Sequence, residues 1–225
     1  MNVLHTIRKI LPLVLTSGLA MADGFDGLDL GVAFGIQNVN YGGGYQLNSY
    51  GPAEFFHSVN DTDGTLNLDI GYNFRTGDKF YTGIVANLQP IDSTIVYAQK
   101  IPGTLTKNLM TSRYDLSLLQ GYLLNPESLI YGKIGYSHAS RKLSDPYQAW
   151  QAQLGYNGYV LGLGIKTESL GRFIGYNRFY GFVEYNFSQY GNQHYKATNP
   201  YRLTVVSSDL GLYANTGLIG IGYVF

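Results

Sequence analysis

The sequence predicts an all-β protein, a closed transmembrane barrel of eight antiparallel strands. Three observations lead to this prediction. Only 13% of the 225 residues are charged, about half of the roughly 25% that is typical of a soluble domain. Apolar side chains alternate with small or polar ones along several segments of the chain. The connections between these segments alternate in length, short on one side and long on the other.

Composition excludes several classes of protein. Gly (29 residues) and Tyr (21 residues) take the place of some of the charged residues that a soluble domain would have, and the formal net charge is zero. A neutral chain has no electrostatic basis for binding nucleic acid, so no nucleic-acid partner is expected. The chain contains no cysteine, which excludes a disulfide scaffold, thiol catalysis and any zinc site that needs thiolates.

Residues 1–22 have the three-part order of a secretory signal peptide. Arg8 and Lys9 form the positive start, an apolar stretch follows, and Ala22 ends the small-x-small pattern after which signal peptidase cuts. A buried N-terminal helix is the alternative interpretation. We expect removal of residues 1–22, which leaves one barrel domain over residues 23–225.

Two segments show complete alternation. Along 28–37 every second residue is Leu, Val, Phe or Ile, and the residues between them are Asp, Gly, Ala and Gln. Segment 66–75 repeats this pattern. Strand side chains point alternately to opposite faces, so each segment is expected to form a strand with one apolar face. Six further strands are expected near 80–88, 110–124, 129–139, 151–167, 179–190 and 205–225.

The connections and the second face of the strands distinguish a membrane barrel from a soluble sandwich. Short connections are expected near 76–78 and 125–128, an intermediate one at 168–178, and long ones at about 38–64, 89–109, 140–150 and 191–204. This alternation is the layout of membrane barrels. Opposite the apolar face lie Gly, Ala, Asn and isolated charges, which suit a narrow barrel interior. A soluble secreted β-sandwich is the alternative, but its exterior would carry more Lys, Glu and Thr.

The C-terminus carries a further pattern. Ile219, Ile221, Tyr223 and the final Phe225 alternate on the outward face of the last strand. This ending resembles the terminal strand of Gram-negative outer-membrane proteins, in which such a strand with a C-terminal Phe is read by the barrel-assembly machinery. The resemblance therefore implies that these four residues form an assembly signal.

The resemblance extends inward along most of the chain. Segments 116–126, 129–136, 161–166 and 182–190 resemble strands of the OmpA-like small-barrel family, which includes opacity proteins and outer membrane immunogenic "porin family" proteins. Gln120 departs from that pattern, because Pro is usual there. The resemblance implies a barrel in the Gram-negative outer membrane, in contact with its lipid and lipopolysaccharide. It also implies short periplasmic turns and four longer extracellular loops.

Charged side chains on the inward face predict a polar interior network. Strand phase places seven of them there: Asp29, Asp69, Arg113, Asp115, Lys133, Lys166 and Glu184. Because an unpaired buried ion is costly, ion pairs are expected, such as Lys133 with Asp115 or Glu184. A gated pore and a filled polar core are both compatible with this set. The narrow interior of an eight-stranded barrel favours the filled core.

One pair of residues could be catalytic. His138 and Ser140 share a face of one strand, outward by strand phase, and resemble the His-x-Ser pair of an eight-stranded lipid A deacylase. No third carboxylate is identifiable, although a nucleophile needs an oriented base, so a polar strand end is the favoured interpretation. No metal or cofactor is expected, since Asp61 and Asp63 resemble only part of a calcium loop.

The predicted function is that of a non-enzymatic barrel that displays a surface for adhesion, host contact or envelope integrity. Loops on a rigid scaffold often carry recognition. The first candidate contact surface is the connection at 38–64, through its aromatic residues Tyr41, Tyr45, Tyr50, Phe55 and Phe56. A narrow porin-like pore for small solutes is the alternative, and a lipid A-modifying deacylase is a weaker one. The sequence does not identify a host ligand.

Overall fold

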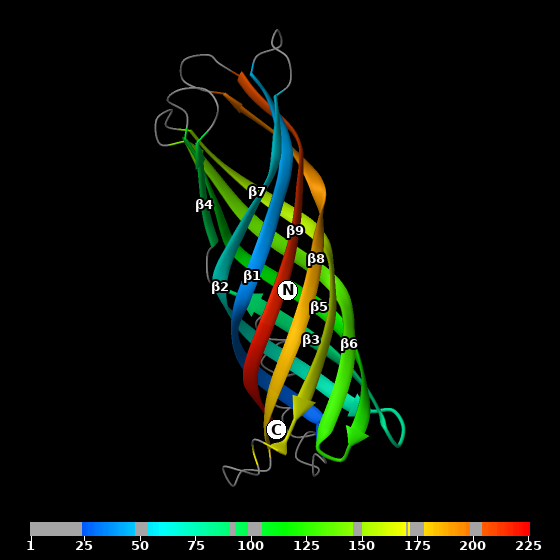
Figure 1. The fold of residues 1–225 in the computed structure, drawn as a ribbon. Helices are drawn as coiled ribbons and strands as arrows, with labels where there is room; N and C mark the ends of the chain where they lie inside the picture. Colours follow the sequence, from blue (N-terminus) through cyan, green and yellow to red (C-terminus); the bar gives the residue numbers. More distant parts are fainter. Residues whose placement is uncertain are drawn as a thin grey trace, which may run out of the picture.

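The computed structural model describes residues 24–47, 54–90, 93–98, 105–145, 150–169, 171, 178–198 and 204–225. Their backbone forms one antiparallel sheet in the order β3-β2-β1-β9-β8-β7-β6-β5-β4, and β3 also pairs with β5. This last pairing closes the sheet into a barrel (Figure 1). The strands are β1 (Gly27–Leu47), β2 (Glu54–Arg75), β3 (Phe80–Gln89), β4 (Ser93–Ala98), β5 (Leu105–Asn125), β6 (Ser128–Asp145), β7 (Trp150–Thr167), β8 (Phe179–Thr198) and β9 (Thr204–Val224).

Strands β3 and β4 occupy one position in the barrel wall. Both pair with β5, since Gln89 lies opposite Arg113 and Ser93 lies opposite Met110. Pro90 follows β3 directly and has no amide hydrogen to donate to a ladder, which accounts for the end of β3 there. The barrel therefore has eight strand positions, which confirms the predicted fold class.

The strands on the extracellular side are much longer than the sequence indicated. Strands β1 and β2 stay paired from Gly27 opposite Asn73 to Tyr45 opposite Glu54. The expected long connection at 38–64 is therefore wrong in extent, and so are those at 89–109, 140–150 and 191–204, into which strands also extend. These segments mix apolar and polar residues without a strict period of two, so they lack the alternation that marks a strand beside lipid.

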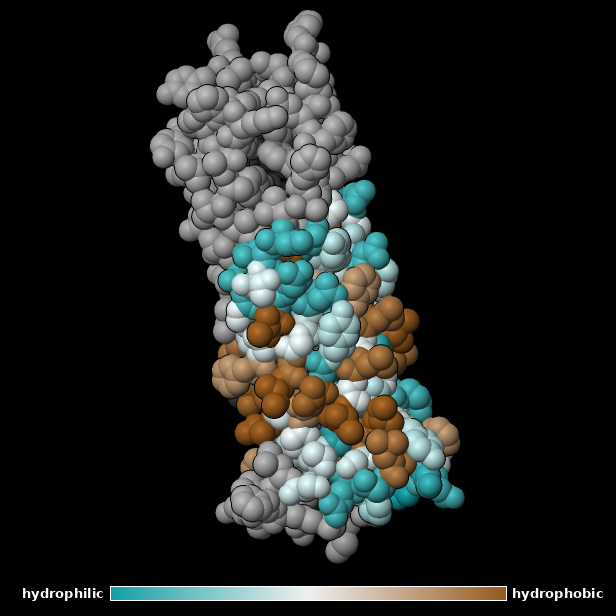
Figure 2. Space-filling model, in the orientation of Figure 1, coloured by the Kyte–Doolittle hydropathy of each residue, from teal (hydrophilic) through white to brown (hydrophobic). Residues whose placement is uncertain are grey.

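Alternation along the strands separates a filled interior from an apolar exterior. Ala33 is fully buried, whereas its neighbour Phe34 is 64% exposed. We call the exposed apolar residues of the lower barrel the lipid-facing belt; it contains Leu30, Phe34, Ile36, Leu68, Ile70, Phe74, Ile84, Leu88, Leu116, Leu118, Leu124, Ile130, Ile134, Leu161, Leu163, Ile165, Val183, Ile219 and Ile221. Figure 2 shows apolar side chains gathered in this zone and hydrophilic ones above it. A soluble monomer rarely exposes an apolar surface of this extent.

Among the described residues, no helix has the length and apolar character needed to span a membrane.

Candidate functional site: the filled interior and the extracellular wall

An ion pair crosses the lower interior of the barrel. Lys166 Nζ on β7 lies 2.6 Å from Asp29 Oδ2 on β1, and both side chains are buried. Asn73 Nδ2 donates to the same carboxylate oxygen at 2.8 Å. The ammonium also lies 4.8 Å from the ring centroid of Tyr180 and 5.5 Å from that of Tyr131. This buried cation is thus surrounded by a carboxylate and two aromatic faces, which offset its loss of water.

A second ion pair lies at the centre of the interior. Lys133 Nζ on β6 is 2.7 Å from Glu184 Oε1 on β8. The carboxylate of Glu184 also accepts hydrogen bonds from Tyr131 Oη at 2.8 Å and from Asn186 Nδ2 at 2.7 Å. Of the two partners expected for Lys133, the structure therefore pairs it with Glu184.

The same layer contains Asp69, which is held by amides rather than by a cation. Asn67 and Asn87 both donate a hydrogen bond to Asp69 Oδ1. Lys133 connects the two groups, because its Nζ donates to Asn87 Oδ1 at 3.3 Å. Side chains from the four strands β2, β3, β6 and β8 thus form one continuous polar layer.

A third polar group lies closer to the extracellular end. Arg113 Nε on β5 is 3.6 Å from Asp115 Oδ2 on the same strand. Arg113 Nη1 also donates to Thr216 Oγ1 at 3.3 Å, across the barrel on β9. Ser137 Oγ donates to Asp115 Oδ1 and lies 2.9 Å from Tyr190 Oη. All seven charged residues assigned to the interior from the sequence lie inside the barrel, and six of them form three ion pairs.

Aromatic side chains close the periplasmic end. Phe25 packs edge-to-face against Tyr81 and Tyr180, with ring centroids 6.3 and 6.2 Å apart. All three side chains are buried. The plug was not predicted from the sequence, because Phe25 lies before the first alternating segment.

The central interior has almost no free volume. The void bounded by the Asp29, Asp69, Lys133, Lys166 and Glu184 side chains offers about 10 Å³ to a water-sized sphere. This is about the room of one water molecule. The interior between the plug and the central ion pair is therefore a packed polar core.

Above the central layer, several buried polar groups lack a protein partner. Gln89, Ser117 and Ser188 each contribute side-chain atoms that are buried and make no hydrogen bond within the described part of the chain. Buried polar atoms in native proteins are normally satisfied, often by ordered water. Ordered water would satisfy these atoms; the same part of the interior also contains a buried apolar cluster, formed by Val39, Ala139, Tyr156, Tyr190, Leu212 and Ala214.

The barrel wall continues far beyond the lipid-facing belt. Eleven residues of β1 follow Ile36, the last belt residue on that strand. At about 3.4 Å per residue and a strand tilt of about 40°, they extend roughly 30 Å along the barrel axis. We call this part, formed by residues 38–47 and 54–64 and the matching ends of the other strands, the extracellular wall (Figure 1).

The residues expected in a surface loop lie mostly in this wall. The backbones of Tyr41 and Tyr45 belong to β1, and those of Phe55 and Phe56 belong to β2. The expectation of a loop at these four positions was therefore wrong. Tyr50 lies outside the described residues.

An acidic pair faces inward in the same wall. Asp61 and Asp63 are two residues apart on β2, above the belt. Burial raises the pKa of the Asp61 carboxyl above its usual value, and the neighbouring charge of Asp63 adds to this effect. The structure shows no group of three or more metal-ligating side chains among the described residues.

His138 and Ser140 lie on the outward face of β6, as strand phase indicated. The His138 Nδ1 atom lies 2.7 Å from Asn157 Oδ1, and its ring stacks on Tyr114 with centroids 4.8 Å apart. Tyr136 Oη also donates to Asn157 Oδ1, at 2.6 Å. The imidazole of His138 is thus oriented by the amide of Asn157 and the ring of Tyr114. A catalytic Ser–His pair requires instead that the imidazole be oriented as a base toward the serine.

Comparisons with known proteins give similarity in fold alone. No family model matches the sequence, and no curated protein matches it. The outer membrane protein OprG of Pseudomonas aeruginosa is 16% identical, with a TM-score of 0.61 over 90% of this chain and 98% of that one. The outer membrane protease OmpT of Escherichia coli is 10% identical, with a TM-score of 0.54 over 92% of this chain and all of that one.

The chain has the fold of an outer-membrane β-barrel. In a barrel of this kind the apolar belt lies in lipid and the short turns lie at the periplasmic end, which is the end that holds the plug. In an outer-membrane barrel, aromatic residues flank the belt at both interfaces. Tyr159 Oη donates to Gln189 Oε1 at 2.6 Å above the belt, and Tyr185 Oη, which belongs to the middle of the belt, donates to Asn215 Oδ1 at 2.7 Å. Together with Tyr136 and Asn157, these pairs link β6, β7, β8 and β9 on the outside.

The last strand of the outer-membrane barrel lies at the seam that joins the two ends of the chain. Strand β9 pairs with β8 on one side and with β1 on the other. The Phe225 amide donates to Leu28 O at 2.8 Å. Tyr223 packs edge-to-face on Phe225 and on Phe179, with centroids 4.8 and 5.0 Å apart. The outward residues of this strand, Ile219 and Ile221 included, face lipid at the final closure.

Proposed function

We propose that the protein is a non-enzymatic surface-display barrel of the outer membrane, whose extracellular wall provides a contact surface for adhesion or host contact. The observation that carries this proposal is the wall itself, which rises roughly 30 Å above the belt while the central interior is packed. A rigid scaffold that holds polar surface away from the membrane suits recognition.

The wall has the chemistry of an exposed contact surface. Its outward side chains on β1 and β2 include Asn38 and Thr62, which hydrogen-bond to each other at 2.9 Å on the exposed face. Lys142 on β6 and Gln153 on β7 lie opposite each other and are exposed. Tyr41, Tyr45, Tyr50, Phe55 and Phe56 remain our first candidates for a contact, since aromatic residues are enriched at interfaces.

The proposal includes export of the protein and its assembly in the outer membrane. Residues 1–22 would direct export and be removed, which leaves residues 23–225 as the barrel domain. The barrel-assembly machinery would read Ile219, Ile221, Tyr223 and Phe225 on the terminal strand. The amide and tyrosine groups above the belt would then contact lipopolysaccharide in the outer leaflet.

The decisive experiment compares attachment by cells that carry different barrels. Bacteria that lack surface adhesins would express the wild type, a variant in which Tyr41, Tyr45, Tyr50, Phe55 and Phe56 are each replaced by Ser, or a matched control with the 126–127 turn replaced. Attachment to epithelial monolayers should require these aromatic residues and not the periplasmic turn. Equal attachment by the wild type and the five-residue variant, with equal amounts of folded barrel, would refute the proposal.

A narrow pore for small solutes is the second candidate. The unpartnered buried groups of Gln89, Ser117 and Ser188 favour it, since buried polar atoms of this kind are often satisfied by ordered water. The plug and the packed central layer oppose it. Planar-bilayer recording distinguishes the two functions, because a pore gives steady single-channel currents and a display barrel does not.

A further inference from the structure

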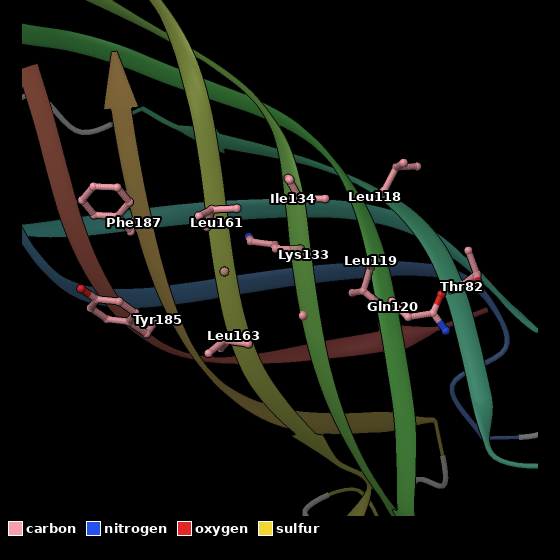
Figure 3. A pocket seen from close by; sticks show the side chains of 12 residues that line it. Thr82, Leu118, Leu119, Gln120, Lys133, Ile134, Leu161, Leu163, Tyr185 and Phe187 are labelled. Carbon is pink, nitrogen blue, oxygen red and sulfur yellow. Dashed lines mark hydrogen bonds between the residues drawn. The ribbon is translucent and has the colours of Figure 1, made fainter.

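A groove crosses the lipid-facing surface of β3, β5, β6, β7 and β8 (Figure 3). Its volume is about 620 Å³. One edge consists of Leu118, Ile134, Leu161 and Phe187, and the other of Thr82, Gln120, Leu163 and Tyr185. Gly132 lies between Gln120 and Leu163 in the second row, where the missing side chain deepens the groove.

The groove climbs from the periplasmic interface towards the middle of the belt. Thr82, at one end, is the third residue of β3 counted from the periplasmic turn. Tyr185, at the other end, is the seventh residue of β8 counted from the same side. The residues between them face one another across successive strands, so the row rises obliquely because the strands are tilted.

The lower end of the groove carries an unexpected polar group. Gln120 faces outward between Leu118 and Tyr122 on β5, with Thr82 and Gly132 opposite it on the two neighbouring strands. Its Oε1 accepts a hydrogen bond from Thr82 Oγ1 at 3.0 Å, and Thr82 Oγ1 lies 3.4 Å from Thr76 Oγ1. Within the described part of the chain, no acceptor is recorded for the Gln120 amide hydrogens. An N–H donor that lies in hydrocarbon without an acceptor is energetically unfavourable, so we expect the Gln120 amide to donate to an acceptor outside the chain.

A cation lies just below this amide. Lys79 precedes β3 in the periplasmic turn, and its Nζ lies 5.9 Å from the ring centroid of Tyr122, two residues from Gln120. The nearby Arg75 is already engaged, since Nε donates to Gly77 O at 3.1 Å and Nη2 donates to Asp78 O. Lys79 is thus the cation placed at headgroup depth beside the mouth of the groove, with Asp78 as its neighbouring anion.

We propose that this groove binds one phospholipid of the inner leaflet. Its phosphate lies beside Lys79, an ester carbonyl accepts from the Gln120 amide, and one acyl chain follows the groove over Gly132. A phospholipid matches the order of groups along the groove. The ammonium of Lys79 corresponds to the phosphate, the amide of Gln120 to an ester carbonyl, and the apolar groove to the acyl chain. The proposal is independent of what the extracellular wall contacts.

Photo-crosslinking tests the proposal on the full mature barrel. The protein is folded into vesicles of phosphatidylethanolamine and phosphatidylglycerol that contain a phosphatidylethanolamine with a diazirine in one acyl chain. After irradiation, mass spectrometry maps the labelled peptides. Labelling of the wild type should concentrate on peptides that contain residues 118–134 and 161–163, relative to belt peptides of β1 and β9.

Two variants and a matched control sharpen the test. Gln120→Leu removes the donor and should lower labelling of the groove about fivefold, as loss of one net hydrogen bond implies. Gly132→Phe should lower it at least as much by filling the groove; a Cβ there meets Leu163 Cδ2 at 3.6 Å, an ordinary contact. Ala86→Phe, on the outward face of β3 outside the groove, should leave labelling unchanged. Heat-modifiable electrophoresis verifies that each variant is folded.

Two results would overturn the proposal. Uniform labelling around the belt, unaffected by Gln120→Leu, would show that the groove holds only bulk lipid. Efficient dimer formation by Gln120→Cys under oxidising conditions in the same vesicles would assign the groove to a second copy of the chain. That experiment is clean because the natural sequence has no cysteine.

Discussion

Replacing Glu184 by Gln should destabilise the folded barrel through the ion pair at its centre. The carboxylate lies 2.7 Å from Lys133 Nζ, and the two side chains are only 6% and 1% exposed. Substitution keeps the shape of the residue and removes its charge. Lys133 then retains only the amide oxygen of Asn87, at 3.3 Å, among its recorded partners outside residue 184.

The expected loss is about 3 kcal/mol in the free energy of unfolding, at the lower end of the range for breaking a buried pair, because Gln still offers an oxygen acceptor. Lys133→Met should cost less, about 2 kcal/mol, since Glu184 keeps the donors Tyr131 and Asn186. The double variant Lys133→Met/Glu184→Gln should be more stable than Glu184→Gln alone, because no unpaired cation then remains in the interior.

Urea titration in lipid vesicles measures these differences, with the folded fraction read from heat-modifiable mobility on a gel. The matched control is Asp78→Asn in the short connection between β2 and β3, where the side chain is exposed. A loss below about 1 kcal/mol in the free energy of unfolding for Glu184→Gln would refute the reasoning. So would a double variant whose loss equals the sum of the two single losses, because additive losses mean that Lys133 and Glu184 are not coupled.

Four further outcomes are expected. The wild type should give no steady current in planar bilayers, and Phe25→Ala/Tyr180→Ala should give none either, because the packed layer around Lys133 and Glu184 remains above the opened plug; a steady current from the variant would show that the plug alone seals the barrel. Deletion of Phe225 should lower the amount of folded protein in the outer membrane several-fold, and full assembly of the truncated chain would argue against the terminal strand as an assembly signal. Overexpression should leave the lipid A mass spectrum unchanged, and His138→Ala and Ser140→Ala should not alter it; a deacylated species lost with Ser140→Ala would instead establish the enzyme. An epitope inserted after residue 50 should be detected by antibody on intact cells, while one inserted after Pro126 should be detected only after permeabilisation; the reverse pattern would invert the orientation.

The sequence predicted the lower barrel well because lipid imposes a simple rule there. Between Leu66 and Phe74, every outward residue contacts hydrocarbon and every inward residue contacts the narrow interior, so the period of two is complete. The same rule assigned Lys133 and Glu184 to one layer. Their direct pairing could not be chosen over Asp115 from the sequence, because it depends on the stagger of β5, β6 and β8 around the closed barrel.

The extension of the strands above the belt could not be predicted from the sequence, for a physical reason. Above Ile36 the outward face of β1 no longer carries the regular apolar residues that contact lipid, and residues such as Asn38 and Asn40 carry no periodic signal, although Val39 still packs in a buried apolar cluster. Strand structure continues there because each backbone is paired on both sides, with β2 and β9. The plug was missed for a different reason: Phe25 precedes the first strand, and only the fold brings it between Tyr81 and Tyr180.

The extracellular wall also determines how this surface can change over generations. A free loop accepts insertions and deletions at most positions, whereas a paired strand accepts mainly exchanges of one side chain for another, since a single added residue shifts the register and reverses inside and outside. Variation that escapes antibodies or adjusts a ligand should therefore accumulate as point substitutions along outward wall positions. Changes in length should be confined to the short tips between paired strands.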